Sequence, residues 1–418
     1  MEYKELATLY YEDSSSTRKS NHETEYLRRF NAESTFRLGF ETPQGELFIA
    51  TPRELTVLAE RVLRTERKIS NLVHNLPGIA SGAVLRSLVL DEIVSTNAIE
   101  DIHSTRRQVK DALDSRFETK LDGKRFRELA TLYLGIVEER AALPTTPEDI
   151  RAIYDEVTRG EISDDKIPDG ILFRAQGVDI VEGGMRVVHS GLEPESAITA
   201  AMSKMLDISR SSDIPSLYRG IAAHYLFEYI HPFYDGNGRT GRYLLSLLLS
   251  ESLSSATALS LSRVIAENRD GYYRAFKTTE KPLNKGELTF FAFSMLELIR
   301  EAQLQLEDRL ERNTQALETM KELTSRIVAE KQLKDQETRI VFMLMQYEAF
   351  GLLGDAPLSD IAAHLGLRDQ MARRHVSSLE NKGIVAKRRA RNPLTFALTE
   401  TFKNEYGIEA PDWHPPIG

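Results

Sequence analysis

The sequence predicts a mainly α-helical protein with a small β-hairpin in its middle and a winged-helix domain near its C-terminus. Most segments repeat apolar residues at spacings of three and four, which is the pattern of amphipathic helices. Two β-rich runs flank Gly183 and Gly184, and such a pair of turn residues is typical of a hairpin. Between Arg339 and Leu398, helical stretches give way to two short strands around a basic turn. These different patterns indicate more than one domain.

The composition is that of a soluble globular protein. The chain has 418 residues, of which 41% are hydrophobic and 28% charged, and it is too long for a single core. It contains no cysteine, which excludes disulfides, thiol catalysis and Cys-ligated metals. No signal peptide and no membrane-spanning apolar run are visible, so we expect a cytoplasmic location and no membrane partner. The net charge of −9 argues against general nucleic-acid binding but not against a local basic patch.

The first third of the chain changes from polar to helical. Residues 1–35 are polar, and we expect a loose arm that packs on another part of the protein or stays mobile. A short hairpin is predicted within 36–50, with its turn at Pro43, Gln44 and Gly45. Apolar spacing then predicts three helical regions, over 52–73, 85–102 and 117–142.

The middle of the chain combines one hairpin with several helices. The hairpin runs from Val178 to His189, and it is the clearest β element before the C-terminus. Helical spacing predicts further helices over 195–208, 217–230, 238–253 and 288–302. The stretch 303–330 is charged, with apolar residues near a heptad rhythm. It predicts a connecting helix, a short coiled coil or a helix that lies along its own domain.

The C-terminal module resembles a winged helix-turn-helix. The segment from Gln370 to Asn381 is predicted to be its recognition helix, with Arg373, Arg374 and Ser377 off the apolar face. Between residues 360 and 400 there are eight Lys and Arg against four Asp and Glu, which suits phosphate contacts. The basic wing contains Lys387, Arg388, Arg389 and Arg391. Binding of DNA and contact with another protein both stay open for this module.

The most informative stretch runs from His231 to Arg242, with the sequence HPFYDGNGRTGR. Its three glycines have the spacing of a dinucleotide-binding loop, but the preceding segment has helical spacing and no acidic residue closes a second strand. We therefore reject a Rossmann interpretation. A glycine-rich turn before a helix instead exposes backbone N–H groups that bind anions.

The side chains of this stretch suit a triphosphate. Arg239 and Arg242 are three residues apart and lie on one helical face. Asp235 could hold Mg²⁺ together with phosphate oxygens, and Asn237 with the amides near Gly236 and Gly238 could form an anion hole. His231, placed where Pro232 prevents a helix from continuing, could accept a proton near neutral pH.

These residues match the pattern His-Pro-Phe-x-Asp/Glu-Gly-Asn-Gly-Arg-x-x-Arg, and the chain thereby resembles the Fic-domain family at every fixed position. The segment 170–174 before the hairpin and the segment 268–273 after the motif agree with the family as well. The resemblance covers residues 90 to 300, approximately, and implies a Fic-type helical core. It also implies transfer of AMP from ATP to a Ser, Thr or Tyr hydroxyl of a target protein, with removal of AMP left open as a further activity.

The resemblance assigns a role to each motif residue. His231 would deprotonate the acceptor hydroxyl, and Asp235 would bind Mg²⁺ at the α- and β-phosphates. Asn237 would hold the α-phosphate, with the amides near Gly236 and Gly238 beside it, while Arg239 would hold the β-phosphate region and Arg242 the γ-phosphate. Separately, the hairpin resembles the family's flap, which holds the target segment by strand addition. Its candidate contact residues are Val178, Ile180, Val187 and Val188; a plain sheet edge is the alternative.

A second resemblance concerns inhibition. Thr96 and Glu100 resemble the motif Ser/Thr-x-x-x-Glu-Gly/Asn of family members that carry an inhibitory helix before the catalytic core. There the glutamate pairs with the second motif arginine, here Arg242, and blocks the γ-phosphate. A carboxylate–guanidinium pair is strong enough to compete with a phosphate oxygen. Asp101 departs from the family's Gly or Asn, which weakens the match.

The expected domain plan and the competing functions follow from these motifs. The favoured function is a self-inhibited protein adenylyltransferase; the alternative is a DNA-binding transcriptional regulator that uses the Fic core as a nucleotide sensor. A homodimer, through the Fic core or through 303–330, stays open. The predicted parts are an N-terminal arm and helical region (1–90), a catalytic core with the inhibitory helix near 91–102 (91–300), a connecting helix (301–336), a winged helix-turn-helix (337–402) and a tail (403–418).

Overall fold

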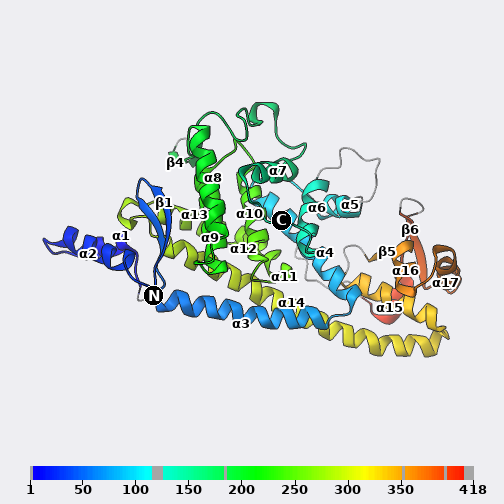
Figure 1. The fold of residues 1–418 in the computed structure, drawn as a ribbon. Helices are drawn as coiled ribbons and strands as arrows, with labels where there is room; N and C mark the ends of the chain where they lie inside the picture. Colours follow the sequence, from blue (N-terminus) through cyan, green and yellow to red (C-terminus); the bar gives the residue numbers. More distant parts are fainter. Residues whose placement is uncertain (1–2, 115–125, 183–185, 351–353, 390–392, 409–418) are drawn as a thin grey trace. The chain divides into compact units, whose positions relative to one another are not determined.

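The structure, a computed structural model, describes residues 3–114, 126–182, 186–350, 354–389 and 393–408. Its chain divides into two compact units, one formed by Met1–Arg67 with Val89–Leu304, and the other by Lys68–Leu88 with Gln305–Gly418. Three long helices continue from one unit into the other: α3 (Arg53–Asn75), α4 (Gly78–Ile99) and α14 (Thr289–Lys331). The fold is mainly helical with small antiparallel sheets, as the sequence predicts (Figure 1).

The N-terminal part of the first unit is folded and packs on another part of the chain. The expected packing of residues 1–35 is therefore confirmed, whereas the expectation that they are loose is wrong for most of their length. Its elements are α1 (Leu6–Glu12), α2 (Arg18–Phe30), β1 (Phe36–Thr42) and β2 (Gly45–Ile49). Asn284 Oδ1 accepts a hydrogen bond from the Ala7 amide at 2.9 Å, and buried Arg29 pairs with Glu287 at 2.9 Å. These partners lie far along the chain, and they hold two helices that local sequence does not predict. The β1–β2 hairpin is as predicted.

Three helices packed side by side form the centre of the first unit: α8 (Glu195–Ser209), α9 (Ser216–Ile230) and α10 (Asn237–Leu249) (Figure 1). Almost every residue of α9 is buried, because its apolar residues surround the helix on all sides. The predicted helices over 195–208 and 217–230 are confirmed within one residue at either end. The helix predicted over 238–253 is too long at its C-terminal end, because α10 ends at Leu249.

Smaller helices complete the first unit: α5 (Arg106–Asp114), α6 (Arg127–Val137), α7 (Pro147–Val157), α11 (Ser255–Ala258), α12 (Leu261–Glu267), α13 (Arg269–Thr279) and the 3₁₀ turns η2 (Asp164–Lys166) and η3 (Pro282–Asn284). The prediction of one helix over 117–142 is only partly tested, because residues 115–125 lie outside the described part. Helix α7 was not predicted, although its start has a clear signal: Thr146 and Asp149 form a capping box, and Pro147 is the first residue of the helix.

The predicted central hairpin is present as β3 (Asp179–Glu182) and β4 (Arg186–Ser190), paired antiparallel. Its turn residues Gly183 and Gly184 lie outside the described residues. The register pairs Ile180 with His189 and Val181 with Val187, with an irregularity between the two pairs. In Figure 1, β4 lies near one end of α8.

The second unit contains the C-terminal module. Its elements after α14 are α15 (Asp335–Phe350), β5 (Asp355–Pro357), α16 (Leu358–Leu365), α17 (Asp369–Asn381), β6 (Val385–Arg389), β7 (Thr395–Leu398) and α18 (Glu400–Tyr406). The strands form one sheet in the order β5-β7-β6. Helix α17 buries Ala372, Val376 and Leu379, and it leaves Arg373 and Arg374 exposed, off the apolar face as predicted. Arg391 lies outside the described residues.

Helix α14 shows that two predicted segments are one. The sequence suggests a helix over 288–302 followed by a separate charged stretch, but α14 runs without a break from Thr289 to Lys331. No glycine or proline interrupts this stretch, so nothing in the sequence ends the helix at residue 302. In the described part of the chain, no helix is long and apolar enough to cross a membrane.

Candidate active site

His231 occupies the end of α9 in an unusual backbone conformation. Its φ of 51° and ψ of 63° are left-handed, and its amide donates to Phe227 O at 3.0 Å as the helix cap. The following proline cannot continue the helix. The ring Nδ1 lies 3.3 Å from the backbone oxygen of Glu228, which can only accept. Nδ1 therefore carries the proton, and the Nε2 lone pair is free to accept another.

The pKa of His231 is lowered to about 4, mainly by burial and to a smaller extent by the nearby His189. The imidazole is therefore neutral near pH 7. A neutral imidazole with a fixed tautomer is the form in which a histidine can act as a general base.

The glycine-rich turn after His231 is held by its own side chains. Gly236 has a φ of 80°, which a residue with a Cβ adopts only at a cost, and Asp235 Oδ1 accepts from its amide at 2.6 Å. Asn237 is buried, accepts from the Phe233 amide at 3.0 Å and donates to the Phe233 carbonyl at 2.8 Å. These bonds fix the turn, so that α10 begins at Asn237 with its amide groups directed toward the turn.

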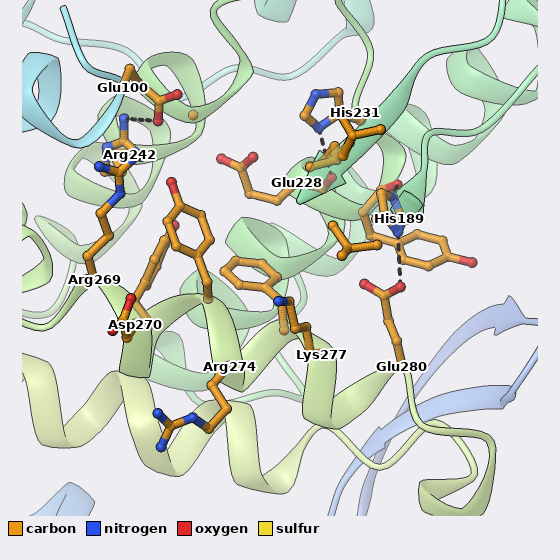
Figure 2. A pocket seen from close by; sticks show the side chains of 18 residues that line it. Glu100, His189, Glu228, His231, Arg242, Arg269, Asp270, Arg274, Lys277 and Glu280 are labelled. Atoms are coloured by element: carbon orange, nitrogen blue, oxygen red, sulfur yellow. Dashed lines mark hydrogen bonds and ion pairs between the residues drawn. The ribbon is translucent and has the colours of Figure 1, made fainter. Parts of the chain in front are cut away.

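Arg242 is buried and contacts Thr96 and Glu100, two residues from the end of α4. Its Nη2 donates to Glu100 Oε1 at 2.7 Å, and its Nε donates to Thr96 Oγ1 at 2.8 Å. A third bond joins Nη2 to the Thr96 carbonyl at 3.2 Å. Only 2% of the Arg242 side chain is exposed, against 31% for Glu100. Arg242 is thus the buried partner of the pair, and Glu100 borders solvent. Figure 2 shows the two side chains and the contact between them.

Gly238 makes room for the Glu100 carboxylate. A Cβ at position 238 would lie 2.1 Å from Glu100 Oε1 and 3.0 Å from Arg242 Nη1. The glutamate therefore occupies space in the first turn of α10 that any other residue at 238 would fill. The same space lies beside the helix N-terminus, where an anion would be bound.

Arg239 forms an ion pair with Glu161, at 2.5 Å between Nη1 and Oε2. Glu161 follows α7 in a loop, and nothing in its sequence context suggests the contact. Arg239 Nε has no hydrogen-bond partner among the described residues. The two arginines of the motif, predicted to share one face, thus meet two different carboxylates.

A cavity of about 900 Å³ lies beside His231 and Arg242 (Figure 2). Gly238 and Glu100 line it, and so do Ile180 and Val188 of the hairpin. The remaining wall comes mainly from α13, with further residues from α9 and the hairpin: Val181, His189, Glu228, Tyr229, Arg269, Asp270, Tyr272, Tyr273, Arg274, Phe276, Lys277 and Glu280. Several predicted site residues do not line it: Thr96, Val178, Val187, Asp235, Gly236, Asn237 and Arg239.

Sequence reasoning missed the titratable groups of this cavity. Glu228 is partly buried, and its Oε1, which is buried, has no hydrogen-bond partner in the described part of the chain. Burial raises the pKa of Glu228 to about 8, so this carboxyl is largely protonated at pH 7. His189 Nδ1 donates to Glu280 at 3.0 Å and its Nε2 donates to the Tyr229 carbonyl at 2.7 Å. Burial opposes the charge of His189, but these acceptors outweigh it and raise its pKa.

A second missed feature is the support of the loop before the hairpin. The Glu195 carboxylate accepts from the amides of Ile171, Leu172 and Phe173 at 2.7–3.0 Å. Arg174 donates to three backbone carbonyls, among them His231 O at 2.9 Å and Leu192 O at 2.8 Å. The segment 170–174 did stand out in the sequence, although its structural role did not.

Asp235 is the predicted Mg²⁺ ligand, and its surroundings fit that chemistry only with help from a substrate. Its side chain is exposed, and one oxygen already accepts from Gly236. No group of three or more metal-binding side chains occurs within the described residues. One carboxylate plus phosphate oxygens is nevertheless a usual environment for Mg²⁺. The site therefore suits a cation delivered with a nucleotide.

Comparison with known proteins gives the class of this site. Residues 144–249 match the model of the Fic/DOC family. These residues, which contain α7 to α10, the hairpin and His231 to Arg242, therefore form a Fic/DOC domain. The match is shorter than the predicted resemblance over 90–300.

The relatives extend this result without settling the activity. A stretch of 63 residues is 43% identical to a probable protein adenylyltransferase of Aquifex aeolicus (strain VF5), covering 15% of this chain and 18% of the relative. The chain thus spans less than a fifth of that relative's length. A Fic family protein from Desulfovibrio desulfuricans G20 shares 20% identity, with 84% of this chain and 97% of that chain covered and a TM-score of 0.48. Fic-1 from C. elegans shares 17% identity, with 75% and 81% covered and a TM-score of 0.46. These scores are too low to add to the sequence match.

Proposed function

We propose that the protein transfers AMP from ATP to a hydroxyl group of a target protein. The observation that carries this proposal is the placement of His231 and Arg242 on one cavity, inside a Fic/DOC domain. His231 supplies a neutral base whose Nε2 is free, and Arg242 supplies a fixed guanidinium group on the same wall. The relative named as a probable protein adenylyltransferase supports the same reaction.

In the proposed reaction, His231 Nε2 takes the proton of a Ser, Thr or Tyr hydroxyl, and the oxygen attacks the α-phosphorus of ATP. The bond between the α-phosphorus and the bridging oxygen breaks, and pyrophosphate leaves. Catalysis of this kind comes from positioning and from charge stabilisation. The N-terminus of α10 and Asn237 would face the α-phosphate, and Arg239 would reach the β-phosphate region only after it leaves Glu161.

A divalent cation such as Mg²⁺ would neutralise phosphate charge when it is bound with ATP. Asp235 would hold it, because its carboxylate is exposed at the turn just before α10. Asp235 keeps one oxygen on the Gly236 amide, which orients the other oxygen relative to the turn.

The same site is proposed to inhibit itself through Glu100. Its carboxylate pairs with Arg242, the arginine proposed for the γ-phosphate, and it lies 2.1 Å from where a Cβ of Gly238 would be. A γ-phosphate and this carboxylate are both anions that need the same guanidinium group, so they exclude each other. Because Glu100 is partly exposed whereas Arg242 is buried, the glutamate is the partner that would move.

The β3–β4 hairpin is proposed to hold the target segment by strand addition. It is a two-stranded sheet in which Ile180 and Val188 face the cavity, while Val187 is 49% exposed and Val178 is partly buried. A target strand added to this sheet would lie beside His231, since Arg174 joins the segment before β3 to the His231 carbonyl.

The test is labelling of protein with ATP carrying a radioactive α-phosphate. Glu100→Gly should raise incorporation, including incorporation into the enzyme itself, and Glu100→Gly combined with His231→Ala should abolish it. Equal labelling of wild type and the Glu100→Gly variant would reject the inhibitory role. Labelling that persists without His231 would reject the proposed base.

A second candidate function rests on the C-terminal unit. Arg373 and Arg374 on α17, with Lys387 and Arg388 on β6, are exposed basic side chains, while Ser377 and Arg389 are partly buried. A winged helix-turn-helix would present such side chains to DNA phosphates. If the Fic core were only a nucleotide sensor, His231→Ala would leave DNA binding and gene expression intact while ATP still altered them.

A further inference from the structure

The residue after Glu100 makes a contact that the inhibitory motif does not predict. Helix α4 ends at Ile99, and the Glu100 and Asp101 amides close the turn on Asn97 O and Ala98 O at 3.0 and 3.2 Å. The Asp101 carboxylate then accepts two hydrogen bonds from Arg269, from Nη1 at 3.1 Å and from Nη2 at 3.2 Å. Such a two-pronged arrangement fixes the orientation of both groups, not only their distance.

The backbone at Asp101 explains which residues the position accepts. Its φ of 56° is in the left-handed region, where glycine, asparagine and aspartate are the residues tolerated best. Asp101 therefore ends α4 as a Gly or Asn would. It adds a negative charge that neither of those residues has, and this charge is the one that Arg269 binds.

Arg269 connects this turn to the opposite wall of the cavity. It is the first residue of α13, the helix that contributes most of that wall, and its guanidinium lies 5.9 Å from the Tyr273 ring centroid. Through Arg269, the turn that carries Glu100 is tied to α13, whereas Glu100 itself is tied to α10 through Arg242. The segment is thus held at two neighbouring residues by two arginines.

We propose that Asp101 and Arg269 position Glu100 against Arg242 and thereby strengthen self-inhibition. This inference rests on the proposed role of Glu100. Loss of the pair frees the turn after α4, so that Glu100 leaves Arg242 more often and ATP binds more tightly. The Asp101 and Arg269 side chains are 80% and 41% exposed, so their ion pair is a surface pair of modest energy. Its loss should therefore change the affinity for ATP about two- to fivefold.

The test measures the affinity of the full-length protein for Mg-ATP by calorimetry, which does not require a target protein. Asp101→Asn removes the charge and keeps a residue that tolerates the left-handed conformation, and Arg269→Gln removes the other partner. Each change is made in the wild type and in the Glu100→Gly variant. Arg263→Gln is the matched control, because Arg263 forms a similarly exposed pair with Glu267 and does not line the cavity.

The proposal expects Asp101→Asn and Arg269→Gln each to raise wild-type affinity two- to fivefold, and to have no effect once Glu100 is glycine. If Glu100→Gly raises affinity but the two variants do not, the pair has no positioning role and the proposed inhibition still stands. If Arg269→Gln lowers affinity in both backgrounds, Arg269 contacts the nucleotide and the proposal is overturned. If Glu100→Gly itself leaves affinity unchanged, both the inhibition and this inference are rejected.

Discussion

Arg239 and Glu161 form a buried ion pair, with 2% and 7% of their side chains exposed. Arg242, three residues further along α10, forms a second ion pair, with Glu100. Each arginine of the motif therefore has a carboxylate partner from earlier in the chain. The two pairs differ in burial: Glu161 is enclosed, whereas Glu100 is partly exposed. We infer that the ion pair between Arg239 and Glu161 mainly stabilises the fold in this state. The ion pair between Arg242 and Glu100 is the one that we expect to break.

Glu161→Gln should destabilise the protein by about 3–5 kcal/mol, because it leaves the Arg239 charge buried without its carboxylate partner. The measurement is unfolding in urea. Glu156→Gln provides the control, since Glu156 pairs with Arg159 at the exposed end of α7 and should cost little. A loss below 1 kcal/mol for Glu161→Gln would mean that Arg239 finds other partners or solvent.

Thr96→Val should cost about 1–3 kcal/mol, since it removes the hydroxyl that accepts from Arg242 Nε and leaves that buried donor unpaired. Thr96→Ser keeps the hydroxyl and should recover most of the stability. Thermal unfolding of the two variants checks this prediction. A loss for Ser with none for Val would show that packing of the threonine methyl group, not the hydrogen bond, matters, because valine keeps that methyl group.

The rate of AMP transfer should not fall near pH 6.5, where protonation of an ordinary histidine would stop it. The proposed transfer needs neutral His231, and the pKa of His231 is lowered to about 4, so activity should be lost only as the pH falls toward that value. In the Glu100→Gly variant this loss of activity should occur at a still lower pH, because the Glu100 charge raises the pKa of His231. The readout is kcat/KM for labelling between pH 4 and 8. A loss of activity centred near pH 6.5 would contradict the burial of the imidazole.

Glu228 should make the protein less stable as the pH rises. Its pKa is about 8 in the folded state against an ordinary value of 4.5, so the unfolded state ionises first. Stability is then fully present below pH 4.5 and declines up to pH 8, by about 1.4 kcal/mol for each unit of difference between the two pKa values.

Glu228→Gln removes this ionisation, and its stability relative to the wild type should therefore increase from pH 5 to pH 8.5. Urea unfolding at the two pH values gives the comparison, with Glu60→Gln on the exposed face of α3 as the control. If the difference in stability between Glu228→Gln and the wild type does not change with pH, the Glu228 carboxylate is in contact with water.

The sequence predicted the elements whose signals are local. The helices before and after His231 and both hairpins of the first unit follow from apolar spacing and turn residues, and the motif located the cavity wall that contains His231, Gly238 and Arg242. The contact of Glu100 with Arg242 was expected from resemblance, and the structure places the two residues within hydrogen-bond distance.

Features that depend on long-range contacts could not be predicted. Helix α1 is short and α2 has few apolar residues, and the two helices find partners in Asn284 and Glu287, far along the chain. Glu161 is one carboxylate in a loop, and no spacing connects it with Arg239. Asp101 looked only like a departure from the inhibitory motif, because its partner Arg269 comes from a distant helix.

The left-handed backbone of His231 sets stability and activity against each other. At a φ of 51°, glycine would be favoured over histidine by about 1 kcal/mol, yet glycine offers no base. With His231 as the proposed base, selection for catalysis would retain a side chain that selection for stability would discard. A library randomised at this position and screened only for heat resistance should become enriched in glycine and asparagine, and the most heat-resistant members should be inactive.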